Sequence, residues 1–224
     1  MRKLLIILFI CYPVYAYTQG WSLEYSLGYG TYQLDDVKSM QAGLQGLNGL
    51  KITDDISGNI THTFALGYMT KHHHFGGSFS YLTTGGRLHI ADYSGSYTVD
   101  MIMNGYRIGA FVRRYINIGF SPLQIYLQLS PGLLFSNLRM EEKLQIYTES
   151  AKETTSLNAT TIYIEPSAGV IYRLTDWLRI SAGCGYEANV GGTLKYSGQK
   201  TDMQAHWNGF RLYGGLIFTL PNRN

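Results

Sequence analysis

Large apolar residues and small polar residues alternate along most of this chain. In the first such stretch, the odd positions are Trp21, Leu23, Tyr25, Leu27 and Tyr29, and the even positions are Ser22, Glu24, Ser26, Gly28 and Gly30. Successive side chains of a β-strand point to opposite faces, so this pattern predicts a strand with one apolar face.

The same alternation returns in further segments, at residues 59–70, 75–84, 105–115, 123–136, 161–173, 177–187 and 210–220. Together with residues 21–32, these segments predict about eight strands. Pro131 and Pro166 fall inside two of them. Because proline has no N–H to donate, we expect a bulge or a local break at each.

The composition of the second face indicates which face meets water. This face consists mostly of Gly and Ser with a few charged residues, whereas the outside of a soluble barrel is rich in Lys and Glu. Small side chains suit a narrow lumen, and the apolar face suits lipid. An open sheet edge in hydrocarbon would leave backbone groups unpaired. The sequence therefore predicts an all-β fold, an eight-stranded antiparallel up-and-down transmembrane β-barrel.

The start of the chain predicts export. Arg2 and Lys3 precede an apolar run over residues 4–10, and Val14 and Ala16 fit a small-residue cleavage site. The run is shorter than the roughly 20 residues that span a bilayer. Cys11 raises the alternative of a lipoprotein, but the residues before it are bulky where small ones are preferred. We expect a signal peptide at residues 1–16 and a barrel domain at 17–224.

Composition supports a membrane barrel and excludes other classes. The chain has 26 Gly and 19 Tyr, and only 15% of its residues are charged, against about 25% in soluble domains. Cleavage would leave 16 basic and 15 acidic residues, so no nucleic-acid partner is expected. Cys184 would be the only cysteine left, which indicates neither a disulfide scaffold nor a zinc site.

The lengths of the connections orient the barrel. Short turns are expected at "KHHH" (71–74), "INIGFSP" (116–122) and "LTD" (174–176), with mostly longer connections after the first, third, fifth and seventh strands. Outer-membrane barrels have short periplasmic turns and long extracellular loops. Trp21, Tyr25 and Trp177 would then form part of a periplasmic aromatic girdle.

Two of the long connections have patterns of their own. In residues 33–58, Val37, Met40, Leu44 and Leu47 have helical spacing, which predicts a short helix near 36–45 with Asp35 or Asp36 as N-cap and its apolar stripe on the barrel mouth. It would either gate or recognise a ligand, or simply cover the rim. Residues 140–156 are the most charged stretch and predict a solvated extracellular hairpin.

The signal peptide, the alternating segments and the final "LYGGLIFTL" strand resemble the small outer-membrane β-barrel family of the OmpA and OmpX kind. The Tyr- and Gly-rich style is similar to barrels of the Bacteroidota. The resemblance covers essentially the whole mature chain through its pattern. It implies a Gram-negative outer membrane and recognition by the barrel-insertion machinery through a terminal aromatic residue. The chain continues past Leu220, so Phe218 would have to serve as that signal.

Charged residues on the predicted inward face are the candidate site. They are Glu24, Glu165, Glu187, Arg107, Arg173, Arg179 and Arg211. One hypothesis is an ion-pair network that plugs the lumen, since charges in a narrow barrel need partners. The alternative is that several of them lie at the rims in water.

Candidate catalytic chemistry is sparse. His72, His73 and His74 are consecutive, and they would converge on a metal only in a tight turn; the alternative is a solvated turn near lipid headgroups. His62, His89 and His206 are expected near extracellular strand ends, and His206 with Asn208 lacks a serine at a suitable spacing for a hydrolase. We predict no catalytic residues, no metal and no cofactor.

The sequence therefore favours a non-enzymatic outer-membrane barrel, monomeric, with a structural or surface-interaction role. Its expected partners are outer-membrane lipid, lipopolysaccharide and the insertion machinery. The alternatives are a porin-like barrel for small solutes, a lipid A-modifying barrel enzyme and a soluble ligand-binding barrel. An eight-stranded barrel is just wide enough for its own side chains, which argues against free diffusion through it.

Overall fold

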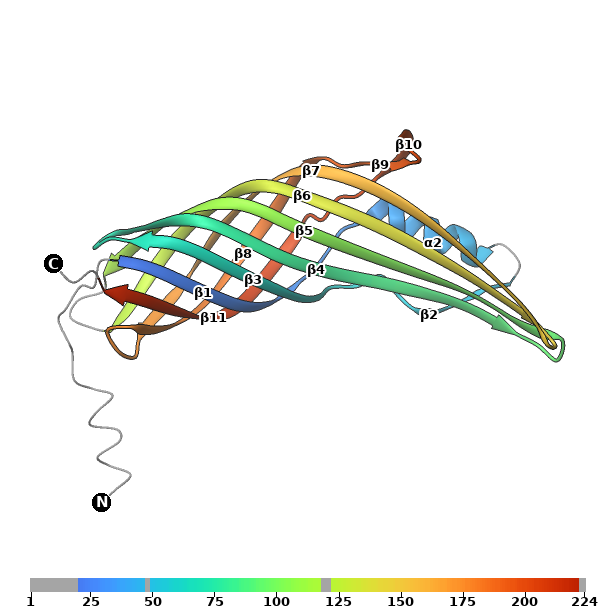
Figure 1. Cartoon of the computed structure of the whole chain (residues 1–224), viewed down its shortest axis with the longest axis horizontal. Helices are drawn as coiled ribbons and strands as arrows, with labels where there is room; N and C mark the ends of the chain where they lie inside the picture. Colours follow the sequence, from blue (N-terminus) through green and yellow to red (C-terminus); the bar gives the residue numbers. More distant parts are fainter. Residues whose placement is uncertain (1–19, 47–48, 118–121, 222–224) are drawn as a thin grey trace, which may run out of the picture.

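The computed structural model describes residues 20–46, 49–117 and 122–221. Within them, eight strands close into one antiparallel ring, in the order β1, β3, β4, β5, β6, β7, β8, β11 and back to β1 (Figure 1). Their bounds are β1 (Gly20–Gly30), β3 (Asn59–Met69), β4 (His73–Ala91), β5 (Gly95–Asn117), β6 (Leu123–Ile146), β7 (Glu149–Arg173), β8 (Leu178–Gly191) and β11 (Gly209–Pro221). The predicted eight-stranded barrel is confirmed. The predicted signal peptide, Cys11 and the residues after Pro221 lie outside the described residues.

The side chains of the ring divide as the alternation predicts. Leu23, Leu66 and Val112 are each more than half exposed on the outer surface. Ser22 and Ser181 are 2% and 1% exposed inside the ring. The apolar face is therefore outside, and this arrangement excludes the soluble barrel, whose apolar face would fill the interior.

The two prolines interrupt strand pairing without shifting it. Pairing between β5 and β6 stops at Gly109 opposite Gly132 and resumes at Val112 opposite Leu129, in the same register. Pairing between β7 and β8 skips the positions beside Pro166 in the same way. The expected local break is confirmed and no bulge forms, because a strand that lacks one donor can keep its alternation on either side.

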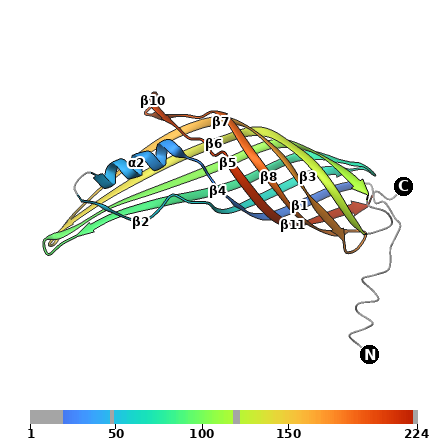
Figure 2. The same ribbon diagram turned by 180° about the vertical axis from the view of Figure 1, so that it is seen from behind.

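Four strands continue well beyond the ring. β4, β5, β6 and β7 have 19, 23, 24 and 25 residues, whereas about 9–11 residues cross a bilayer. The connections expected after the third and fifth strands are therefore long hairpins with short turns at residues 92–94 and 147–148. Figures 1 and 2 show this four-stranded extension of the described chain leading away from the ring. The hairpin predicted at 140–156 is confirmed.

The faces exchange polarity where the extension begins. Tyr81, Tyr106 and Phe135 lie side by side as an outward aromatic row. Beyond that row most outward positions are polar, such as Arg87 and Lys143, with Ile102 as an exception. The inward positions become apolar and are buried, as at Leu88 and Met101. The row therefore marks the level at which lipid gives way to water outside the barrel.

A second apolar core closes the barrel mouth. It lies between the inner face of the extension and α2 (Asp35–Gly46), β2 (Lys51–Asp54), β9 (Thr193–Tyr196) and β10 (Gln199–Gln204). Val37 of α2 and Trp207 are completely buried in it. We call this cluster the mouth core; its other fully buried members are Leu34, Leu82, Leu88, Leu134, Leu138, Leu194 and Ala205. No helix of the described chain is long and apolar enough to cross a membrane.

The predicted helix over the mouth is confirmed, but its cap differs. The helix starts at Asp35, and the preceding Leu34, with φ of 43°, supplies the carbonyl that accepts the Lys38 N–H. Asp36 Oδ2 instead accepts the backbone N–H of Gln204 at 2.7 Å. The carboxylate fixes the neighbouring connection, which sequence spacing alone does not reveal.

The end of the ring opposite the extension largely follows the prediction. Trp21 and Trp177 are exposed there and contact Tyr68 and Phe218. Tyr25 was wrongly assigned to that girdle. It lies in the middle of β1 on the outer surface, and its hydroxyl is 3.1 Å from His62 Nδ1. The turn expected at 116–122 lies mostly outside the described residues.

Candidate functional site

A group of four buried charges occupies the lumen beneath the mouth core. Arg107 lies 2.6 Å from Glu165 and 3.1 Å from Glu187, and Arg211 lies 2.6 Å from Glu187 and 3.5 Å from Glu165. They come from β5, β7, β8 and β11, and none of the four is more than 6% exposed. We call this group the lumen tetrad. Its two positive and two negative charges balance, as burial of ions in a low dielectric requires.

A second ion pair lies deeper in the barrel. Arg113 contacts Glu24 at 3.0 and 3.1 Å, and its Nε donates to Gln128 Oε1 at 2.7 Å. Sequence reasoning placed Arg113 on the inward face but left it out of the network. Its position, six residues after Arg107 on the same strand face, was the signal that could have found it.

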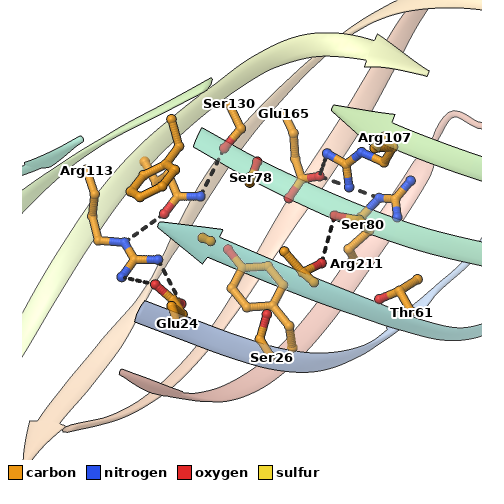
Figure 3. Close-up of a pocket in the computed structure, with 15 residues that line it drawn as sticks. Glu24, Ser26, Thr61, Ser78, Ser80, Arg107, Arg113, Ser130, Glu165 and Arg211 are labelled. Carbon is orange, nitrogen blue, oxygen red and sulfur yellow. Dashed lines mark hydrogen bonds and ion pairs between the residues drawn. The ribbon is translucent and has the colours of Figure 1, made fainter. Parts of the chain in front are cut away.

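A cavity of about 60 Å³ separates the two charge groups (Figure 3). It is lined by side chains of both groups and by hydroxyls such as Ser26, Thr63 and Ser80. A polar cavity of this size has room for water, which would bond to the polar atoms facing it. The lumen at this level is thus a polar pocket enclosed by ions.

Glycine pairs make room for tyrosines in the lumen. Gly109 faces Gly132 across β5 and β6, and a Cβ at Gly132 would lie 2.6 Å from Tyr163 Oη. Gly169 faces Gly183 across β7 and β8 and accommodates Tyr126 in the same way.

An arginine covers each of these rings. Arg107 lies 4.2 Å from the Tyr163 ring centroid, and Arg113 lies 4.5 Å from that of Tyr126. These four glycines therefore have a packing reason, because each pair leaves room for a tyrosine ring on which a guanidinium stacks.

Adding a methyl group at one of these glycines should force the stack apart. We expect Gly183→Ala to destabilise the barrel by about 1–3 kcal/mol, the usual range for overpacking. The loss should be smaller in a Tyr126→Phe background, because the Tyr126 hydroxyl is the nearest atom to the new methyl. Urea unfolding in lipid vesicles measures both variants. Equal losses in the two backgrounds would contradict the stack.

An apolar layer closes the end of the lumen opposite the extension. It contains Met69, Tyr115, Tyr126, Ile171 and Ile217, all buried. His74 is also fully buried beside this layer: Nε2 is 2.6 Å from Ser22 Oγ and Nδ1 is 3.2 Å from Tyr115 Oη. The expectation of a solvated histidine turn is thus wrong for His74. It holds for His72 and His73, which are exposed. The three imidazoles do not converge, because the alternation of β4 points His73 and His74 to opposite faces.

The structure places the remaining predicted charges at the end of the ring opposite the extension. Arg179 is buried and contacts Met69 Sδ. Arg173 lies opposite Arg179 in the register of β7 and β8 and is half-buried. Of the seven predicted network residues, the tetrad brings four together, and Glu24 joins Arg113 instead. Only Arg173 is not buried, so the alternative of several charges in water at the rims does not describe this lumen.

The histidines considered for catalysis make separate structural hydrogen bonds. His89 Nδ1 is 2.9 Å from Thr98 Oγ1 on the extension. His206 Nε2 contacts Gln204 Oε1 at 2.5 Å, and the Asn208 side chain accepts the Asn189 N–H. Among the described residues, no group of three or more His, Cys, Asp or Glu is placed to hold a metal ion.

The outward face of the extension carries a ladder of ion pairs, in which the basic side chains are exposed and cover the acidic ones. Asp100 contacts Arg87 and Lys143, and Glu141 contacts Arg139 and Lys152. Burial raises the pKa of Asp100, but its hydrogen bonds from Lys143 and Arg87 outweigh this and leave the pKa below its ordinary value.

The second carboxylate of the ladder, Glu141, also has a lowered pKa. The hydrogen bond from Lys152 lowers the pKa of Glu141. Both acids therefore stay ionised at neutral pH, which suits a surface above the membrane.

These features define a class of protein. A closed ring of strands, an apolar outer belt and a lumen filled with balanced charges are the properties of a small, eight-stranded transmembrane β-barrel. No protein-family model matches the chain, and no curated protein sequence matches it.

The chain is similar to several solved structures of bacterial proteins. Neisserial surface protein A (NspA) is 14% identical over 90% of this chain and 97% of its own, with a TM-score of 0.47. Ail, the attachment invasion locus protein of Yersinia pestis, is 14% identical over 89% and 99%, with a TM-score of 0.39. LpxR from Salmonella typhimurium is 9% identical over 89% and 100%, with a TM-score of 0.28. The likeness concerns the fold alone, and the class rests on the strand ring and its belt.

Proposed function

We propose that this protein is a non-conducting, non-enzymatic barrel of a Gram-negative outer membrane that anchors a rigid extracellular sheet and presents it for contact. The observation that carries this proposal is the filling of the lumen at successive levels. From the periplasmic side these are the apolar layer, the Arg113–Glu24 pair, the lumen tetrad and the mouth core. Outer-leaflet lipid would surround the apolar belt, and the chain would act as a monomer.

The extension supports a role in presentation. Its inner face has its own buried core, so the sheet is held in one position above the barrel instead of moving as a loop. The helix α2 is fixed to this core by Val37 and by Gln41, whose amide donates to the Asp54 carbonyl at 2.8 Å. This packing favours a helix that permanently covers the barrel mouth. To act as a gate, α2 would have to leave the mouth core.

Single-channel recording tests the closed lumen. We expect the purified protein, refolded into planar bilayers, to give no steady openings, because every level of the lumen is occupied by side chains. A general-diffusion porin reconstituted in the same way is the positive control. Steady, large openings by the wild-type protein would show a transport barrel and overturn the proposal.

Two further measurements address location and chemistry. Cell fractionation with an unboiled gel should place the protein in the outer membrane, with a mobility that changes on heating. Mass spectrometry of lipid A from cells with and without the protein should give the same acyl pattern. Loss of an acyl chain only in expressing cells would show the enzyme alternative to be correct.

A further inference from the structure

At the far end of the extension, the described residues leave an apolar surface partly exposed. Ile90, Tyr97 and Leu144 lie side by side in register on β4, β5 and β6, on the same face as the mouth core. Ile146 follows on β6. Ile90, Leu144 and Ile146 are 36%, 41% and 46% exposed. Figures 1 and 2 show that α2 packs over this face nearer the barrel and ends short of the tip.

Carboxylates border this surface. Glu142 lies directly opposite Glu153 across β6 and β7, so both point to the uncovered face. Within the described residues neither has an ion pair, and like charges in that position destabilise a sheet. Lys143 and Lys152, next to them in the chain, point to the opposite face, where they pair with Asp100 and Glu141.

Tyr97 joins the carboxylates to the apolar patch. Its hydroxyl donates to Glu142 Oε2 at 2.6 Å. Burial raises the pKa of Tyr97 to about 12, with that hydrogen bond and the charges of Glu142 and Glu153 adding to the effect. The patch and its negative border are thus one continuous surface, which we call the tip face: Ile90, Tyr97, Glu142, Leu144, Ile146 and Glu153.

The neighbouring turns present two exposed tyrosines. Tyr93 and Tyr147 are 97% and 73% exposed, and the Tyr147 N–H donates to the Ser94 carbonyl at 3.3 Å, so the two turns lie together. Tyr147 has φ of 50°, the left-handed region in which glycine or asparagine would be favoured. The two-residue turn at 147–148 requires such a φ, so this conformation follows from the tight hairpin.

We propose that the tip face is a docking site for a protein segment that carries apolar side chains and at least one lysine or arginine. The apolar side chains cover Leu144 and Ile146, and the cation lies between Glu142 and Glu153, relieving their repulsion. Charge complementarity selects this occupant, because the inward-facing ionisable residues beside the patch, Glu142, Glu149 and Glu153, are all acidic. The inference rests on the proposed function only in placing the sheet outside the cell.

A display library of random 12-residue peptides tests the proposal directly. Purified protein in lipid nanodiscs is used for selection, and enriched peptides are then measured by fluorescence anisotropy. We expect enrichment of sequences that combine apolar residues with lysine or arginine. Glu142→Gln with Glu153→Gln, and separately Leu144→Thr with Ile146→Thr, should each weaken binding of these peptides by tenfold or more.

Matched controls separate the tip face from the rest of the sheet. Gln145→Ala and Ser150→Ala lie on the outward face of the same hairpin and should change the dissociation constant less than twofold. An unchanged mobility shift on heating shows that each variant still forms the barrel.

Four results would overturn the docking site. They are enriched peptides without basic residues, equal binding by the tip-face variants, binding of phosphatidylglycerol vesicles in place of peptides, or calcium binding at Glu142 and Glu153 with no peptide enriched. If any of these occurs while the barrel remains closed in single-channel recording, the docking site fails and the proposed function stands. Steady openings with specific peptide binding would give the reverse conclusion.

Discussion

Replacing Glu187 with glutamine is expected to destabilise the barrel by about 3–5 kcal/mol, the cost of leaving a buried charge without its partner. Glu187 is completely buried and contacts both arginines of the lumen tetrad. Glutamine has almost the same shape, so the loss would measure charge and not volume. The tetrad would be left with two guanidinium groups and one carboxylate, all of them buried in the lumen.

Urea unfolding in lipid vesicles, followed by tryptophan fluorescence, measures this effect. Glu149→Gln at the exposed far turn of β7 is the matched control and should stay within about 0.5 kcal/mol of the wild type. Adding Arg211→Met to Glu187→Gln restores neutrality, since Arg107 and Glu165 remain paired at 2.6 Å. The double variant should recover more than half of the lost stability. An unfolding midpoint for Glu187→Gln equal to that of the wild type would mean that the tetrad is not held by its charges.

Replacing Trp207 with alanine is expected to loosen the mouth core by about 3–5 kcal/mol, the usual cost of deleting a large buried aromatic side chain. Trp207 is 0% exposed, its ring packs edge-on against Tyr32 at 4.8 Å, and its Nε1 donates to Ser136 Oγ at 2.8 Å. Alanine would remove the packing and leave the Ser136 hydroxyl without that donor. The contacts that close the ring itself do not depend on this side chain.

Hydrogen exchange should separate the two consequences. Amides of α2 should exchange roughly a hundredfold faster or more, since each 1.4 kcal/mol corresponds to a factor of ten. Amides of β1 and β11 should keep their protection, and the mobility shift on heating should persist. Trp177→Ala, which changes an exposed tryptophan at the other end of the barrel, should leave exchange in α2 unchanged. Faster exchange throughout the ring after Trp207→Ala would show that the two cores unfold together.

The two expected results describe a protein with two different interiors. The lumen is polar because its outside must be apolar to meet lipid, and each of its buried ions needs a partner. The mouth core is apolar because its outside meets water. The same four strands serve both interiors, with Tyr81, Tyr106 and Phe135 at the change of level.

The alternation of residues predicted which charged side chains of the candidate site point inward. It did not predict which acid forms an ion pair with which base. The period of two placed Arg107, Glu165, Glu187 and Arg211 on the inward face. Which acid meets which base depends on the stagger of distant strands around the ring, which local pattern does not encode. Arg113 was missed as a partner of Glu24 for that reason, although its inward position was predictable.

The sequence by itself determined the ring, the outward apolar belt, the break at the prolines and the helix over the mouth, because each follows from the spacing of residues close together in the chain. Only the tertiary structure decided how far β4 to β7 continue. Past Tyr81 the residues still alternate, but the apolar side chains now lie on the inward face. A prediction that traces the outward apolar face along the sequence therefore ends each strand at that point. This reversal is explained only by the tertiary structure, in which α2 and Trp207 cover the inward face of the extension. Such contacts join residues far apart in the chain, as with Trp207 and Ser136, which are 71 positions apart, so the folded chain alone determines that the extension has a core and that its tip is left partly exposed.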